Sequence, residues 1–127
     1  MKILLVDDEE IIHLSYTEHL QDGGFEVLNA YNGNDALKLA REENPDLVIL
    51  DLLMPGKDGR DVCKELKNDE ETRHIKIIML TGKDEQHDRV LGFELGADEY
   101  LPKPYPVNFL EVAVRKQLGL HPYPDMD

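Results

Sequence analysis

The sequence lacks the features that mark several classes of protein. It has no tryptophan and one cysteine in 127 residues, so Cys63 has no partner for an internal disulfide. Proteins of oxidising compartments commonly carry paired cysteines, and nothing here indicates such a compartment. The apolar runs are short, such as residues 3–6 and 77–80, whereas a membrane-spanning helix needs ~20 apolar residues. We therefore expect a cytoplasmic protein with no membrane segment.

Basic residues are also scarce. Lys and Arg total 14 against 27 Asp and Glu, which gives a net charge of −13. Proteins bind nucleic acid through clustered Lys and Arg, so this composition argues against direct nucleic-acid binding. A chain of this length suits one domain, because domains commonly run ~100–150 residues. We assign residues 1–120 to that domain and residues 121–127, which contain two prolines, to a flexible tail or the start of a linker.

What the sequence does contain is an alternation of short apolar runs and longer amphipathic segments. The runs lie near residues 3–6, 25–28, 46–51, 76–80 and 99–101. Continuous apolar runs of this length are typical of strands buried on both faces of a parallel sheet. A segment with apolar residues at helical spacing follows each run. These stripes are Ile12, Tyr16 and Leu20; Ala36, Leu37 and Ala40; Val62 and Leu66; Val90, Leu91 and Leu95; and Leu110, Val114 and Leu118. The pattern predicts a three-layer α/β fold with a five-stranded parallel sheet and five helices.

Polar side chains follow four of the five predicted strands. Asp7 and Asp8 follow the first, Asp51 the third, Thr81 the fourth and Lys103 the fifth. Ligands of such sheets bind beyond the carboxyl ends of the strands, so we expect these side chains to share one site.

Three neighbouring carboxylates raise one another's pKa values unless a cation or a proton relieves the repulsion. Oxygen ligands favour Mg²⁺, which binds one or two carboxylates together with water and phosphate oxygens. A lysine suits a phosphoryl group as a compact positive charge, and a threonine hydroxyl can donate to it. An aspartate carboxylate can itself accept a phosphoryl group. The residues therefore predict Mg²⁺-dependent phosphorylation of one aspartate.

Four motifs carry a resemblance to a known family: Val6-Asp7-Asp8-Glu9, Asp51-Leu52-Leu53-Met54-Pro55-Gly56, Leu80-Thr81-Gly82 and Tyr100-Leu101-Pro102-Lys103-Pro104. In this order and spacing they resemble the receiver domains of two-component response regulators, over residues 1–118. The resemblance implies a flavodoxin-like sheet with strand order 2-1-3-4-5. It also implies a phosphorelay switch that catalyses only its own phosphorylation and dephosphorylation, and is not otherwise an enzyme.

The resemblance implies a role for each site residue. Asp51 is the phosphoacceptor. Asp8, Asp51 and the backbone carbonyl of Leu53 ligate Mg²⁺ directly, and Asp7 acts largely through bound water. Lys103 pairs with the phosphoryl group, and the Lys103-Pro104 bond is expected to be cis.

Two further residues are implied to form the switch. Thr81 moves to hydrogen-bond the phosphoryl group, and Tyr100 turns inward. This motion reshapes the face made by the fourth helix, the fifth strand and the fifth helix. Considered alone, Thr81 is equally suited to cap the fourth helix, and Tyr100 could be a static surface aromatic.

The resemblance also implies the partners. A histidine kinase or a histidine phosphotransfer protein supplies the phosphoryl group, and a downstream protein target or a fused effector domain receives the signal. Ile11 lies off the Ile12, Tyr16 and Leu20 stripe and beside the acidic site, so it is a candidate kinase contact. A phosphorylation-dependent dimer stays open. The fifth helix offers Phe109, Val112 and Ala113 before Arg115 and Lys116, and this charge pattern is incomplete for the dimers of DNA-binding regulators.

Two other functions compete with this interpretation. A Mg²⁺-dependent aspartyl-phosphate phosphatase of the haloacid dehalogenase class needs a second aspartate two residues after its nucleophile, where this chain has Leu53. A flavin-binding protein needs a phosphate-binding loop after the first strand, where Asp7 and Asp8 would repel a phosphate.

The remaining reactive residue types have simpler interpretations. The five histidines, at positions 13, 19, 74, 87 and 121, lack metal-ligand spacing, and we predict that each lies on the surface. Cys63 lies on the third predicted helix and is expected to be a small buried apolar residue.

Overall fold

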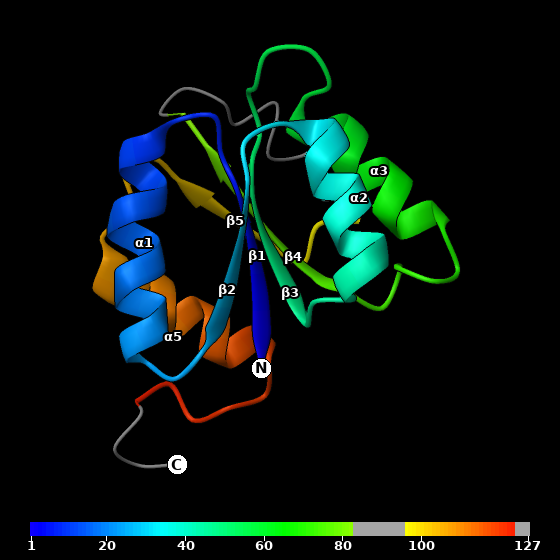
Figure 1. Ribbon diagram of the computed structural model, residues 1–127. Helices are drawn as coiled ribbons and strands as arrows, with labels where there is room; N and C mark the ends of the chain where they lie inside the picture. Colours follow the sequence, from blue (N-terminus) through cyan, green and yellow to red (C-terminus); the bar gives the residue numbers. More distant parts are fainter. Residues whose placement is uncertain (83–95, 124–127) are drawn as a thin grey trace.

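The computed structural model describes residues 1–82 and 96–123, which are built around one parallel sheet (Figure 1). Its strands are β1 (Lys2–Val6), β2 (Glu26–Ala30), β3 (Leu47–Asp51), β4 (Lys76–Thr81) and β5 (Glu99–Pro102). Their spatial order is β2-β1-β3-β4-β5, with every neighbouring pair parallel. The predicted strand order is therefore confirmed.

Helices cover both faces of the sheet. In Figure 1, α1 (Glu10–Asp22) and α5 (Val107–Gln117) lie on one side, and α2 (Gly33–Glu43) and α3 (Gly59–Asn68) lie on the other. This arrangement confirms the three-layer α/β class. Residues 1–82 and 96–123 hold four helices. The fifth predicted helix, marked by Val90, Leu91 and Leu95, lies outside the described residues.

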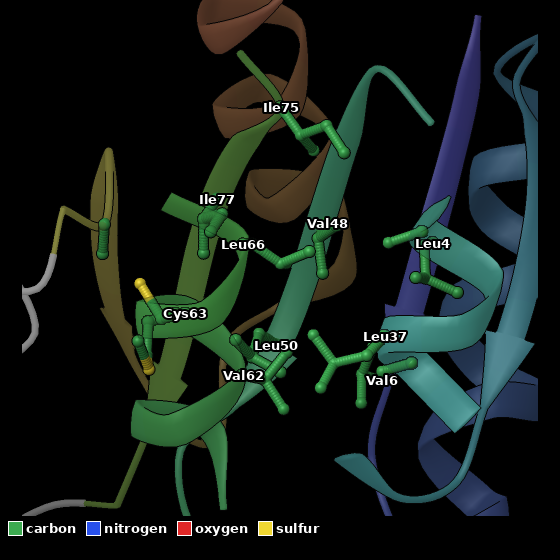
Figure 2. Close-up of a cluster of buried hydrophobic side chains, with 14 of the residues drawn as sticks. Leu4, Val6, Leu37, Val48, Leu50, Val62, Cys63, Leu66, Ile75 and Ile77 are labelled. Atoms are coloured by element: carbon green, nitrogen blue, oxygen red, sulfur yellow. The ribbon is translucent and has the colours of Figure 1, made fainter. Parts of the chain in front are cut away.

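The core has two layers because successive side chains of a strand point to opposite faces. Val48 and Leu50 of β3 pack toward α2 and α3 (Figure 2), while Leu47 and Ile49 pack toward α1 and α5. All five residues of β3 are buried, as expected for the central strand of a parallel sheet. Cys63 of α3 is fully buried in the first layer, which confirms the prediction for it.

The strand register places the site residues at one edge. Val6 lies opposite Leu50, so Asp7 directly follows β1 beside the last residue of β3, Asp51. Asp51 in turn lies opposite Leu80 of β4, one residue before Thr81. Within the described part of the chain, no helix is both long and apolar enough to span a bilayer.

Candidate functional site

Three carboxylates meet at the carboxyl edge of the sheet. Each of Asp7, Asp8 and Asp51 offers an oxygen, and these oxygens all lie within 4.8 Å of one another. Asp7 and Asp51 are buried, whereas Asp8 is exposed. The sequence prediction that these three acids share one site is therefore confirmed.

Lys103 joins two of the three acids. Its Nζ lies 2.8 Å from Asp7 Oδ2 and 3.3 Å from Asp51 Oδ1. The backbone N–H of Lys103 donates to the Thr81 carbonyl, which fixes the loop after β5 against the end of β4. The Lys103-Pro104 peptide bond is cis, as expected. The fifth strand thus delivers a single ammonium group into the acidic cluster.

The charges of this cluster alter its proton affinities. Burial, followed by the negative charge of Asp7, raises the pKa of Asp51 from 3.8 to about 6, although Lys103 and the backbone N–H of Leu53 oppose the rise. Burial lowers the pKa of Lys103, but its hydrogen bond to Asp7 and the charges of Asp51 and Asp7 raise that pKa further, and the net shift is upward. Lys103 is therefore protonated at neutral pH, and the pKa of Asp51 lies close to neutral pH.

The donor set fits a divalent cation. Carboxylate oxygens are the ligands that Mg²⁺ prefers, and exposed Asp8 leaves one side of the cluster open to water and ligands. Three carboxylates and one ammonium carry a formal charge of −2 when all are ionised, which a divalent cation balances. The side chain of Leu53 is exposed, and its backbone N–H donates to the Asp51 carboxylate.

Thr81 lies on β4, the strand next to the one that ends in Asp51, and Tyr100 lies on β5, one strand further along the sheet. Thr81 is the buried last residue of β4, and its Oγ1 donates to the Gly82 carbonyl at 3.4 Å. Tyr100 of β5 is 3% exposed and packs in the core layer shared with α2 and α3, so the alternative of a surface aromatic is wrong. A capping contact between Thr81 and the fourth helix involves residues outside the described ranges.

The loop after Asp51 closes tightly against the strand that precedes it. A Cβ added to Gly59 would lie 2.3 Å from the Asp51 carbonyl oxygen and 2.8 Å from the Leu52 Cα. The Gly59 N–H donates to the Leu52 carbonyl at 2.8 Å. Only glycine permits this approach, so Gly59 helps to fix the backbone that carries the Asp51 carboxylate.

Comparisons with known proteins agree with this geometry. A family model described as "Response regulator receiver domain" matches residues 3–115. The chain belongs to this family. A putative response regulator from Chloroflexus aurantiacus J-10-fl is 34% identical, with a TM-score of 0.88, and the match covers 93% of this chain and 97% of that one. The chemotaxis protein CheY4 of Vibrio cholerae is 30% identical, with a TM-score of 0.85 and coverage of 91% and 96%.

Receiver domains also occur in larger signalling proteins. The signal receiver domain of a signal transduction histidine kinase from Syntrophus aciditrophicus is 32% identical, with a TM-score of 0.86 and coverage of 93% of this chain and 89% of that one. Receiver domains are signalling switches that work with histidine kinases and effectors. This receiver domain shares their fold and holds the cluster of three carboxylates at the end of its sheet.

One prediction for a polar residue is wrong, and a second polar residue is buried without having been predicted. His13 was predicted to lie on the surface, but it is 2% exposed and contacts the backbone of Asp7. On α5, Ala113 and Arg115, which were considered for a dimer face, are both buried. The Arg115 guanidinium pairs with Glu111 and donates to the Gly23 carbonyl, each at 3.0 Å. His13 directly follows Ile12, and Arg115 directly follows Val114, so each lies at the edge of its helix's apolar stripe. That edge position was the available signal that the residue could be buried.

Proposed function

We propose that this receiver domain accepts a phosphoryl group on Asp51 in a Mg²⁺-dependent reaction. The observation that carries the proposal is the position of the Asp51 carboxylate, which lies 3.3 Å from the Lys103 ammonium and beside the carboxylates of Asp7 and Asp8. A nucleophilic carboxylate, an open cluster of oxygen ligands and a fixed cation are the parts that phosphoryl transfer to aspartate requires.

The residues divide the chemistry as follows. An ionised Asp51 oxygen attacks the phosphorus atom of a phosphohistidine, the new O–P bond forms, and the N–P bond breaks with its electron pair returning to the imidazole nitrogen. Lys103 stays protonated and turns from Asp7 toward the incoming phosphoryl oxygens. Asp8, Asp51 and the Leu53 carbonyl would hold Mg²⁺, with Asp7 acting largely through water. When bound, the metal would neutralise charge on the phosphoryl oxygens.

Phosphorylation would then change the protein surface through Thr81 and Tyr100. Thr81 ends β4 one residue after Leu80, which lies opposite Asp51, and its hydroxyl donates to the Gly82 carbonyl at 3.4 Å. We propose that this hydroxyl turns to donate to a phosphoryl oxygen. Tyr100 already occupies an inward position on β5, and a shift of Thr81 would stabilise it there. The affected face would include β5, α5 and the fourth-helix residues that lie outside the described ranges.

The phosphoryl donor is proposed to be a histidine kinase or a histidine phosphotransfer protein. Ile11 and Leu14 of α1 are 69% and 63% exposed, and they lie close in sequence to the acidic residues that follow β1. Apolar side chains of this size on the open side of a charged site suit a protein partner. A downstream protein or a fused effector domain would receive the signal, and a phosphorylation-dependent dimer is one form that the output could take.

Acetyl phosphate supplies a direct test. With Mg²⁺, the wild-type protein should gain one phosphoryl group that hydroxylamine removes, and EDTA should prevent the labelling. Asp51→Asn should not be labelled. The matched control is Asp58→Asn, which changes an acid of the same loop but keeps an N-cap residue on α3, and it should be labelled normally. Labelling of Asp51→Asn, or repeated turnover of a phosphate ester, would contradict the proposal.

A further inference from the structure

His13 is a buried polar residue that the proposed chemistry does not use. Its Nε2 lies 2.8 Å from the backbone carbonyl oxygen of Asp7, and its Nδ1 lies 2.6 Å from the side-chain oxygen Oδ1 of Asn29 on β2. The Thr17 hydroxyl donates to the same Asn29 oxygen at 3.0 Å, and the ring of Tyr31 lies 4.0 Å from the His13 ring, centroid to centroid. The imidazole is therefore held between α1, β2 and the end of β1.

The contact with Asp7 has a fixed direction. A carbonyl oxygen only accepts hydrogen bonds, so Nε2 carries a proton and donates to it. This carbonyl belongs to the peptide unit that links Asp7 to Asp8. Because a peptide unit is planar, holding its oxygen also sets the direction in which the chain enters Asp8. His13 thus contacts the one peptide that lies between two of the three clustered acids.

The other polar atoms of Asp7 are held from different directions. Its N–H donates to the Ala30 carbonyl at 3.2 Å, and its carboxylate accepts from the Glu9 N–H at 2.9 Å and from Lys103 at 2.8 Å. Phosphorylation would move Lys103, and a bound cation would draw on the carboxylates. The contacts to Ala30 and His13 act on the backbone instead, so they can persist through both changes.

We propose that His13 is a positioning residue that fixes the Asp7–Asp8 peptide and so keeps the two carboxylates in the geometry that binds a divalent cation. This inference rests on the proposed Mg²⁺ site. It assigns part of the site's affinity for the cation to a buried side chain of α1, which contacts the backbone of Asp7 and not a carboxylate of the cluster.

Two substitutions separate the two ring nitrogens. The amide nitrogen of glutamine lies close to the position of Nε2, so His13→Gln can still donate to the Asp7 carbonyl. Asparagine is one methylene shorter and reaches only as far as Nδ1, so His13→Asn keeps the side toward Asn29 and loses the contact with Asp7. Calorimetric titration of each purified full-length protein with MgCl₂ should give near-wild-type affinity for His13→Gln. For His13→Asn it should give about a tenfold loss, the lower end of what removal of a residue that supports metal ligands causes.

The outcomes distinguish this inference from the proposed function. If the wild type fails to bind Mg²⁺, the proposed function falls and this inference falls with it. If the wild type and both variants bind Mg²⁺ equally, or if both variants lose affinity in proportion to their loss of stability in urea, only the positioning role is overturned. If His13→Asn does not fold, NMR of the ¹⁵N-labelled wild type decides the matter. The His13 Nε2 resonance should shift as Mg²⁺ is added, and an unchanged resonance at saturating Mg²⁺ would refute the role.

Discussion

Replacing the Asp51 carboxylate with the amide of asparagine should stabilise the metal-free protein at neutral pH. Asp51 is 4% exposed and lies beside Asp7, and these surroundings raise its pKa from 3.8 to about 6. The raised pKa means that the folded protein disfavours the ionised carboxylate relative to the unfolded chain. Asparagine has nearly the same shape and no charge, so the variant avoids that penalty.

The pKa shift sets the size of the effect. A difference of about 2 pKa units, at ~1.4 kcal/mol per unit, corresponds to about 3 kcal/mol at pH 7.5 as an upper limit. The amide also brings two N–H donors that need partners, which reduces the gain. We therefore expect the free energy of unfolding of Asp51→Asn to exceed that of the wild type by about 1–3 kcal/mol in EDTA.

The pH dependence has a definite sign. Between pH 3.8 and about 6 the folded protein holds the Asp51 proton more tightly than the unfolded chain does. The wild type therefore loses stability from this group as the pH rises through that window, and asparagine does not. The advantage of Asp51→Asn should be near zero at pH 4 and should reach its plateau above about pH 7. Added Mg²⁺ should reduce or reverse it, because a ligand that binds the folded wild type stabilises that state.

Urea denaturation at several pH values, with and without Mg²⁺, measures this difference. Glu70→Gln is the matched control, because it removes the same charge from an exposed loop position and reports the effect of net charge alone. The reasoning is refuted if Asp51→Asn is no more stable than Glu70→Gln at pH 7.5 in EDTA. It is also refuted if the advantage of Asp51→Asn does not change with pH.

Three further predictions concern individual residues. Ile11→Asp should slow phosphoryl transfer from the cognate kinase about tenfold, which corresponds to a loss of ~1.4 kcal/mol at a contact, and should leave acetyl phosphate labelling unchanged. The control, Phe109→Asp on α5, should change neither rate. Equal losses in both assays for Ile11→Asp would count against docking at this residue. Gly59→Ala should lower the free energy of unfolding by about 2–3 kcal/mol, because the added Cβ would overlap the Asp51 carbonyl. Urea denaturation measures the change, and an unchanged unfolding midpoint would show that the loop can open without strain. Burial raises the pKa of Cys63 to about 11, so roughly one thiol in a thousand is ionised at pH 8. An aromatic disulfide reagent should therefore label Cys63 only after urea unfolds the protein. Rapid labelling of the native protein would disprove the burial of Cys63.

The sheet and the acidic cluster were predictable because they depend on local patterns and one topological rule. Short apolar runs identify buried strands, and a parallel sheet brings the carboxyl ends of its strands to one edge. Asp7, Asp51 and Lys103 each follow or end such a run, so they can be placed together without knowledge of any long-range contact. The strand order needed the family resemblance, since the runs themselves do not say which strands are neighbours.

His13 and Arg115 could not be placed in the same way. A polar side chain is buried when partners satisfy it, and each of these two residues has at least one partner that is distant in sequence. Asn29 lies 16 residues from His13, and the Gly23 carbonyl lies 92 residues from Arg115. Helical periodicity assigns a residue to the edge of a buried face, but it does not reveal a hydrogen-bond partner on another element. The edge positions of a stripe are therefore where prediction from sequence failed.

The charge of the site explains why Lys103 matters before any phosphoryl group arrives. Burial and Asp7 both raise the pKa of Asp51, and Lys103 is the charge that opposes them. Without Lys103 the pKa of Asp51 would rise above about 6, and Asp51 would be protonated in a larger fraction of molecules near pH 7. A protonated carboxyl is a poor nucleophile, so in the proposed reaction the ammonium would keep Asp51 ready to attack. The same ammonium leaves the cluster with a formal charge of −2, which preserves its attraction for a divalent cation. In the proposed function, one lysine would thus meet two requirements, an ionised nucleophile and an acidic cluster that can still bind a divalent cation.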